Sequence, residues 1–154
     1  MTTVPATATT SSPTVNGRVI GLAHYAGRAI VESVLTRYGL TFQQLVTLRP
    51  AAVADTPVQR DDLVRQVVDG LKIDPAEAGD AVEALITKGL LAPEASLVRV
   101  TDSGRALYAD TSAETAQISA RIYAGIPTED LAAAGRVLTL VTERANQELA
   151  AVSR

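Results

Sequence analysis

The sequence of 154 residues has no cysteine, a single histidine and very few aromatic side chains. Without cysteine there is neither a disulfide framework nor a thiolate zinc site. One histidine also excludes a multi-histidine metal site within a single chain. Aromatic residues make up 3% of the sequence and hydrophobic residues 47%, so the core must consist of alanine, leucine, valine and isoleucine. These small aliphatic side chains suit closely packed helices.

Long apolar runs and known catalytic motifs are missing as well. No stretch approaches the ~18 apolar residues that a membrane span needs, and the N-terminus lacks the basic flank and apolar segment of a secretory signal. There is no phosphate-binding glycine loop, no G-x-G-x-x-G after a strand, no G-x-S-x-G and no H-E-x-x-H. We therefore expect one domain, located in the cytoplasm, with no membrane segment, metal or cofactor.

Positive charge is scarce in the middle of the chain. The net charge is −3. The segment from Thr41 to Arg105 holds seven basic and ten acidic residues, so seven minus ten accounts for the whole excess, and the remaining residues carry seven of each sign. Lys and Arg are the side chains that neutralise nucleic-acid phosphates, so this segment is poorly equipped for that task.

Local capping patterns predict a series of helices. Asn16 precedes a long apolar periodicity that stops at Gly39, and Thr41 with Gln44 forms a capping box. Pro50 lacks an N–H and is expected to kink or end the second helix near Arg49. The expected elements are a disordered tail at 1–15, helices at 16–38, 41 to about 49, 57–70, 75–88, 102–124 and from about 129, and a strand at 97–100.

The stretch from Lys72 to Arg105 has the most informative pattern. It begins with a helix start at Asp74, Pro75 and Glu77 and stops at Gly89, which favours a left-handed conformation. A leucine pair, a turn at 93–96, the strand at 97–100 and a capping Thr101 follow. This order predicts a helix-turn-helix with a wing.

The same stretch resembles the MarR family. Leu85-x-x-x-Gly89-Leu90-Leu91 followed by Val100-Thr101-Asp102-x-Gly104 is similar to that family's L-E-x-x-G-L-I … L-T-x-x-G. The resemblance runs from about Gly17 to the C-terminus and implies a mainly α winged helix-turn-helix fold with long N- and C-terminal dimerisation helices and a short β-ribbon wing. A single domain at 16–154 would then contain a winged-helix lobe at about 41–105 and a dimerisation lobe made of 16–39 and 106–154.

The resemblance also implies a function. The chain would be a homodimeric, ligand-responsive transcriptional regulator whose helix at 75–88 enters the major groove of duplex DNA while the wing at 92–100 touches the minor groove. Free N–H groups at the start of the preceding helix, near Gln59 and Arg60, could meet a phosphate. Arg99 in the wing and Arg105 after it would contact other phosphates. The residues implied at the DNA are Gln59, Arg60, Ala76, Gly79, Asp80, Glu83, Arg99 and Arg105.

The sequence departs from the family pattern at the DNA-facing positions. The exposed side of the helix at 75–88 is acidic, with Glu77, Asp80 and Glu83, and the basic wing with its D-x-R pattern is missing. Two alternatives therefore stay open. The scaffold has lost DNA binding and serves as a small-molecule binder or an enzyme, or its acidic surface mimics nucleic acid or docks a basic protein.

A polar stripe on the first helix is a candidate ligand site. His24, Arg28 and Glu32 follow one another at intervals of four, with Tyr25 beside them. One interpretation is a solvated face with an Arg28–Glu32 ion pair. The resemblance instead implies a pocket for a small aromatic or anionic ligand. Its binding residues would be His24, Tyr25, Arg28 and Gln44, and in the enzyme alternative His24 would act as acid or base with Tyr25 and Arg28 beside it.

Overall fold

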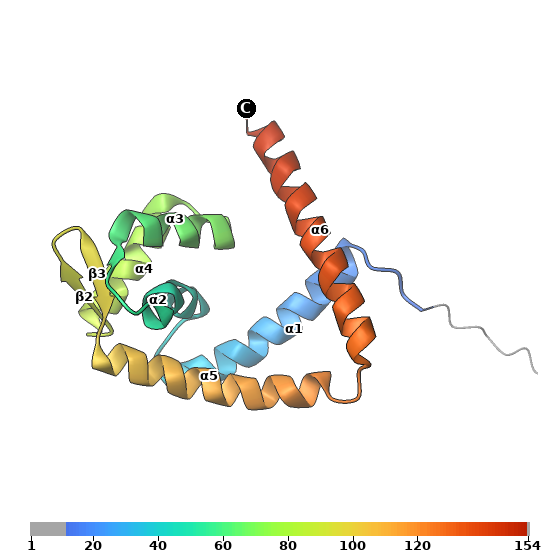
Figure 1. Ribbon diagram of the computed structural model, residues 1–154, viewed down its shortest axis with the longest axis horizontal. Helices are drawn as coiled ribbons and strands as arrows, with labels where there is room; N and C mark the ends of the chain where they lie inside the picture. Colours follow the sequence, from blue (N-terminus) through green and yellow to red (C-terminus); the bar gives the residue numbers. More distant parts are fainter. Residues whose placement is uncertain (1–11, 154) are drawn as a thin grey trace, which may run out of the picture. The chain divides into compact units, whose positions relative to one another are not determined.

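The computed structural model describes residues 12–153, which are mainly helical (Figure 1). The chain forms two compact units, the first ending at Thr115 and the second beginning at Ala116, and one long helix, α5, contributes to both. Most of the tail predicted at 1–15 lies outside the described residues. The elements are, in order, α1 (Gly17–Thr36), α2 (Phe42–Val53), β1 (Val58–Gln59), α3 (Arg60–Leu71), α4 (Pro75–Thr87), β2 (Leu91–Glu94), β3 (Leu97–Val100), α5 (Asp102–Tyr123) and α6 (Thr128–Val152).

Helices whose caps are local in sequence begin where the sequence predicts. The Asn16 side chain accepts from the Val19 amide at 3.0 Å and starts α1. Thr41 and Gln44 form both hydrogen bonds of the capping box at the start of α2. Between these two helices Gly39 takes a φ of 66°, a left-handed conformation that suits glycine.

Of the two outcomes predicted for Pro50, a kink or an end of α2 near Arg49, the end is wrong. The helix continues to Val53 with Pro50 inside it, although proline cannot donate to the carbonyl four residues earlier. Ala51 and Ala52 lie in the following turn and are only 3% and 5% exposed. Their packing in the core outweighs the local cost of the proline, as tertiary contacts commonly do for helices.

The predicted helix start at Pro57 is also wrong. Val58 and Gln59 form β1, which pairs antiparallel with β3, and α3 begins only at Arg60 without a side-chain cap. The Arg60 amide donates to the Ser96 carbonyl at 3.0 Å, so the first turn of α3 is tied to the loop of the wing. A local pattern of Thr, Pro and Gln cannot report such a distant strand partner.

The sheet has three antiparallel strands in the order β1-β3-β2. The turn predicted at 93–96 is shorter than expected, because β2 extends through Pro93 to Glu94 and only Ala95 and Ser96 connect it to β3. Proline is tolerated there since β2 is an edge strand. The β2–β3 hairpin is the wing and lies beside α4 (Figure 1).

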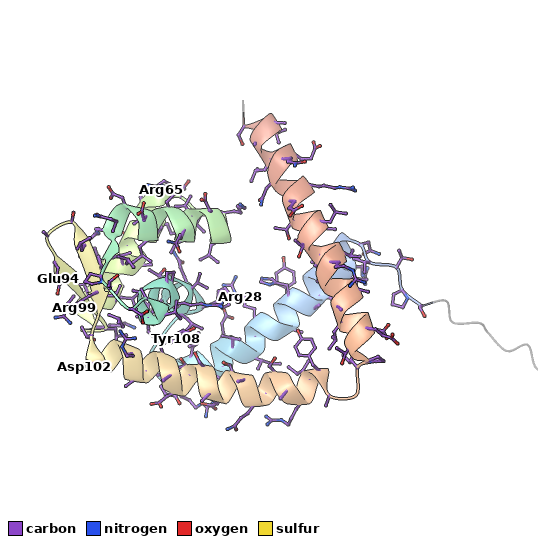
Figure 2. All side chains as sticks on the ribbon, in the orientation of Figure 1. Arg28, Arg65, Glu94, Arg99, Asp102 and Tyr108 are labelled. Atoms are coloured by element: carbon purple, nitrogen blue, oxygen red, sulfur yellow. The ribbon has the colours of Figure 1, made fainter. Side chains whose placement is uncertain are left out.

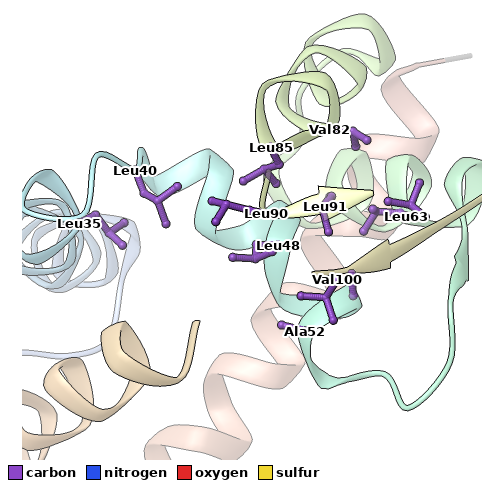
Figure 3. Packing of buried hydrophobic residues seen from close by; sticks show 12 residues of the cluster. Leu35, Leu40, Leu48, Ala52, Leu63, Val82, Leu85, Leu90, Leu91 and Val100 are labelled. Atoms are coloured by element: carbon purple, nitrogen blue, oxygen red, sulfur yellow. The ribbon is translucent and has the colours of Figure 1, made fainter. Parts of the chain in front are cut away.

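The hydrophobic core of the first unit lies where α2, α3, α4 and the sheet meet (Figure 3). α4 turns one apolar face to this core, since Ala78, Val82 and Leu85 are fully buried. α1 adds Val34 and Leu35 from its C-terminal end only. Aliphatic side chains from every layer are almost inaccessible to solvent, namely Leu35, Leu48, Leu63, Val82, Leu85, Leu91 and Val98.

The helix α6 in the second unit has no buried residue. Apolar side chains nevertheless recur along it at intervals of three and four, and many are 41–48% exposed. They include Val137, Leu138, Leu140, Val141 and Leu149. Among residues 12–153 no helix is both long enough and apolar enough to cross a membrane.

Candidate nucleic-acid interface

The motif G-L-L … T-x-x-G fixes the end of α4 to the start of α5. Gly89 takes a φ of 70° and ends α4. The Thr101 hydroxyl donates to the Gly89 carbonyl at 2.7 Å and accepts from the Gly104 amide at 3.0 Å, which confirms Thr101 as the cap of α5. The Thr101 amide donates to the Leu90 carbonyl at 3.1 Å. A Cβ on Gly104 would stand 2.1 Å from the same Leu90 oxygen, so only glycine allows this approach.

The outward face of α4 is accessible. Ala76, Asp80 and Glu83 are exposed and Gly79 is half-buried, while the opposite face enters the core. Asp74 precedes the helix as predicted, but its side chain makes no capping hydrogen bond. Five of the eight predicted DNA-facing residues therefore lie on α4 or the wing.

The arginines predicted to meet phosphates all have partners within the chain. Arg60 Nη2 lies 2.7 Å from Glu83 Oε1, so α3 and α4 are joined by an ion pair. Arg99 Nε lies 2.5 Å from Glu94 Oε1, across the wing from β3 to β2 (Figure 2). Arg105 Nη1 donates to the Ala52 carbonyl at 3.0 Å, at the C-terminal end of α2, where positive charge is favourable. Each positive charge is thus partly satisfied before any DNA approaches.

Gln59 and the start of α3 offer less to a phosphate than the sequence predicts. The Gln59 side chain is exposed and makes no capping hydrogen bond, and its backbone belongs to β1. The Arg60 amide, one of the N–H groups expected to be free, is bonded to Ser96. Asp61 and Asp62 follow in the first turn of α3 and place negative charge there.

The predicted ligand-binding residues lie on α1 and α2. Arg28 Nε contacts Glu32 Oε1 at 2.8 Å with both side chains about half exposed, and the guanidinium lies 4.8 Å from the centre of the Phe42 ring. The rings of His24 and Tyr25 meet edge to face at 5.6 Å, and Tyr25 is 68% exposed. The Arg28–Glu32 pair expected on a solvated face is therefore present.

Gln44, the fourth predicted ligand-binding residue, serves the helix junction. Its Oε1 accepts from the Thr41 amide in the capping box and from Lys88 Nζ at 3.1 Å. Lys88, at the end of α4, also donates to the Gly39 carbonyl. The amide of Gln44 thus joins the α1–α2 turn to the end of α4.

A groove that the sequence does not predict opens between α2 and α4. It has a volume of about 230 Å³ and is open to solvent. Gln43 Nε2 donates to the Glu77 carbonyl at 3.4 Å along this groove. Only the packing of α2 on α4 brings its lining together, so no sequence pattern reveals it. The lining residues are Thr41, Gln43, Gln44, Glu77, Asp80, Ala81 and Ala84.

The end of α1 is fixed to α5 by polar contacts with one carboxylate. The Tyr38 hydroxyl donates to Glu114 Oε2 at 3.2 Å, and Arg37 forms an ion pair with the same carboxylate. Partial burial raises the pKa of Tyr38 above the usual 10.0, and the hydrogen bond and negative charge of Glu114 raise it further.

The helices α2, α3 and α4 with the β2–β3 hairpin define the class of the fold, a winged helix-turn-helix. Three solved structures with a similar fold show more closely which winged-helix proteins this chain resembles. CouR from Rhodococcus jostii RHA1, bound to p-coumaroyl-CoA, has a TM-score of 0.70 with 22% identity, covering 82% of this chain and 90% of CouR. The MarR-family protein Rv2887 of Mycobacterium tuberculosis, in complex with DNA, has a TM-score of 0.65 with 19% identity, covering 84% and 98%.

A third structure, BpsR of Bordetella bronchiseptica, whose DNA binding is regulated by 6-hydroxynicotinic acid, has a TM-score of 0.65 with 24% identity over 89% of this chain and 99% of BpsR. The fold of the chain is therefore similar to that of these structures, one of them a MarR-family protein, which confirms the predicted mainly α winged-helix architecture.

Comparison of the sequence alone finds fewer similar proteins than comparison of the structure. No family model matches the chain. The trifolitoxin operon protein TfxC of Rhizobium leguminosarum bv. trifolii is 38% identical over 73 residues, which are 46% of this chain and 20% of TfxC. The chain thus spans about a fifth of the length of that relative, and the activity of the whole relative cannot be assigned from so short a match.

Proposed function

We propose that this chain is a transcriptional regulator of the MarR type that binds duplex DNA through α4 and the wing. The observation that carries the proposal is the accessible outer face of α4 beside the β2–β3 hairpin, in a fold that Rv2887 shows in complex with DNA. A helix of this kind fits the major groove of B-DNA. The absence of side-chain bulk at Ala76 and Gly79 lets the first turns of α4 approach base edges closely.

The proposed DNA contacts follow from chemistry and exposure. The Asp80 carboxylate can accept a hydrogen bond from a cytosine N4 amino group. Gln59 is exposed at the start of α3 and can donate to a phosphate. Arg60 and Arg99 reach phosphates only by leaving their glutamate partners. Arg105 is held at α2 and contributes through its charge.

The regulator is proposed to act as a homodimer in the cytoplasm. None of the apolar side chains along α6 is buried in the described chain, and their spacing suits a helix that packs against another helix. A second copy supplies such a helix by symmetry. Two winged-helix lobes then read two half-sites of one operator.

A small aromatic or anionic ligand is proposed to control DNA binding. CouR is bound to p-coumaroyl-CoA and BpsR responds to 6-hydroxynicotinic acid, both of which contain an aromatic ring. In this chain the exposed Tyr25 ring can stack on such a ligand. Arg28 can form a charge-assisted hydrogen bond with a carboxylate by exchanging its Glu32 partner. His24 contacts the Tyr25 ring and lies one helical turn before Arg28.

Binding to random duplex DNA tests the proposal directly. At low salt the protein should retard a random duplex, and raising the salt should release it, since phosphate contacts depend on counterion release. Selection from a random pool should then enrich a two-fold symmetric sequence. A complete lack of retardation at low salt, together with no enrichment, would remove the regulator from consideration.

The second candidate is a scaffold that has lost DNA binding and uses its ligand site as a binder or an enzyme. The specific observation in its favour is that Arg60, Arg99 and Arg105 are all engaged within the chain. Here His24→Ala and Arg28→Ala should weaken the binding of a co-purifying ligand, or abolish its turnover, while DNA retardation is absent for every variant. Unchanged ligand affinity in both variants argues against the site.

A further inference from the structure

Two glutamates stand beside two arginines of the proposed DNA surface, the half-buried Arg60 and the exposed Arg99. Glu83 on α4 pairs with Arg60 on α3, and Glu94 on β2 pairs with Arg99 on β3. Both pairs join different elements. They differ from the Arg65–Asp62 pair, which lies within one turn of α3.

Each pair holds its arginine at a defined place. The Arg60 side chain is 35% exposed, and its own amide is bonded to Ser96 in the wing loop. Arg99 lies opposite Ala92 in the β2–β3 register, two residues along the hairpin from the level of Glu94, so its guanidinium reaches diagonally to the carboxylate. Neither arginine can turn to a phosphate without breaking its ion pair.

We propose that Glu83 and Glu94 are positioning residues that restrain affinity for bulk DNA by holding Arg60 and Arg99 in ion pairs. The inference rests on the proposed function. It concerns the part of DNA affinity that is independent of sequence, which comes almost entirely from Lys and Arg at phosphates. A chain restrained in this way relies on base contacts from α4, because few phosphate contacts remain.

The restraint acts in two ways. A phosphate must first displace a carboxylate from the arginine, and the released carboxylate then faces the DNA polyanion. Ion pairs this exposed contribute little to the stability of the fold, so removing a glutamate releases the arginine without unfolding the lobe. The effect is therefore separable from any structural role of the same residues.

The test measures binding of Glu83→Gln, Glu94→Gln and the double variant to a random duplex between 50 and 200 mM salt. Affinity at low salt should rise in each variant. The slope of log K against log salt should steepen by about 0.9 for each arginine that gains a phosphate. Over this fourfold salt range, each released arginine should thus add about a 3.5-fold loss of affinity.

Asp61→Asn is the matched control, because it removes one negative charge next to Arg60 but releases no arginine. Among residues 12–153 Asp61 takes part in no ion pair. The DNA affinity of Asp61→Asn should rise less than that of Glu83→Gln. The slope of log K against log salt for Asp61→Asn should stay near that of the parent chain. Thermal melting of every variant confirms that the lobe is folded.

A double-mutant cycle decides whether the glutamates act through the arginines. In an Arg60→Gln background, Glu83→Gln should gain no more than Asp61→Asn does, and the same holds for Glu94→Gln in Arg99→Gln. An equal gain with and without the arginine overturns the inference, since charge removal alone then explains it. The inference is also overturned if the parent chain binds DNA and the glutamine variants show the same slope of log K against log salt as the parent chain.

The two proposals fail in different ways. If the parent chain and the double glutamine variant both leave random DNA free at low salt, and no sequence is enriched, the regulator and this inference fall together. If the parent chain binds an enriched sequence but the glutamine variants behave like Asp61→Asn, only the inference falls. Where the parent chain enriches a sequence but leaves random DNA free, retardation of random DNA by the double variant supports both.

Discussion

Position 104 has no room for a side chain. A Cβ there would meet the Leu90 carbonyl oxygen at 2.1 Å, and a backbone atom held by Thr101 cannot move aside easily. Gly104→Ala should therefore push α5 away from the end of α4 and lower the free energy of unfolding by about 1–3 kcal/mol, the usual cost of overpacking. Urea unfolding followed by circular dichroism measures the loss.

Gly79→Ala provides the control for this substitution. Gly79 lies inside α4 and a Cβ there has no neighbour within 4 Å, so alanine should leave stability unchanged or raise it by up to about 1 kcal/mol through helix propensity. Equal losses in the two variants would show that the contact between Gly104 and Leu90 is not the cause.

The Tyr38 phenol should make stability depend on pH in the alkaline range. Its raised pKa means that the folded chain holds this proton more tightly than the unfolded chain, in which the phenol titrates near 10.0. The resulting stabilisation is complete below pH 10 and is lost as the pH rises through the raised pKa. Urea midpoints across this range should fall less in Tyr38→Phe, and equal falls in both proteins contradict the assignment.

At the residue scale, the partners of side chains could be predicted only where they are close in sequence. The Arg28–Glu32 pair spans one helical turn and follows from spacing alone. The partners of Arg60 and Arg105 lie on other elements, at Glu83 and Ala52. Nothing in the local pattern shows that these arginines are engaged. The sequence therefore overestimates the number of arginines that are available to a phosphate.

At the scale of elements, helix starts are predicted correctly where the capping partners are close in sequence and wrongly where a distant element decides the conformation. Thr41 and Thr101 cap helices with hydrogen bonds inside four residues, and both starts are predicted correctly. The region around Val58 fails because its conformation is decided by pairing with Val98 in β3. The local residues resemble a capping box, but backbone hydrogen bonds to a distant strand hold them in an extended conformation.

Pro50 in α2 gives a prediction at this scale. Replacing it with alanine restores an N–H in the helix interior, where proline costs about 3 kcal/mol relative to alanine. Pro50→Ala should raise the free energy of unfolding by at least about 1 kcal/mol, given that the surrounding core has adapted to proline. Thermal unfolding of the two proteins measures the gain.

Pro75→Ala is the matched control. Pro75 occupies the first position of α4, where its missing N–H would have no partner within the helix. This substitution should change stability by about 0.5 kcal/mol or less, with a small loss expected. A similar gain at both positions would mean that the interior location of Pro50 has no special cost.

At the scale of the whole molecule, the apolar stripe of α6 leads to a prediction of oligomeric state. The chain should sediment as a dimer at micromolar concentration. A charge inserted in the stripe by Leu138→Glu together with Val141→Glu should give a monomer, because both side chains would lose an apolar contact surface and carry unpaired charge into it. Sedimentation velocity distinguishes the two states.

Gln147→Glu adds the same kind of charge to the side of α6 opposite Leu138 and should leave the dimer intact. A parent chain that sediments as a monomer contradicts the proposal directly. The sequence alone indicates the stripe, but its proposed partner is a second chain, which no pattern within one sequence can identify.

The pairing of β1 with β3 has a consequence for how fast the molecule folds. Val58 lies opposite Val98, so the intervening chain, with all of α3 and α4, must close into a loop before this pairing can form. Closing a long loop has an entropic cost that precedes the gain from the contact. We therefore expect the helices to form early and the three-stranded sheet late, so that Val98→Ala should mainly accelerate unfolding while leaving the refolding rate almost unchanged.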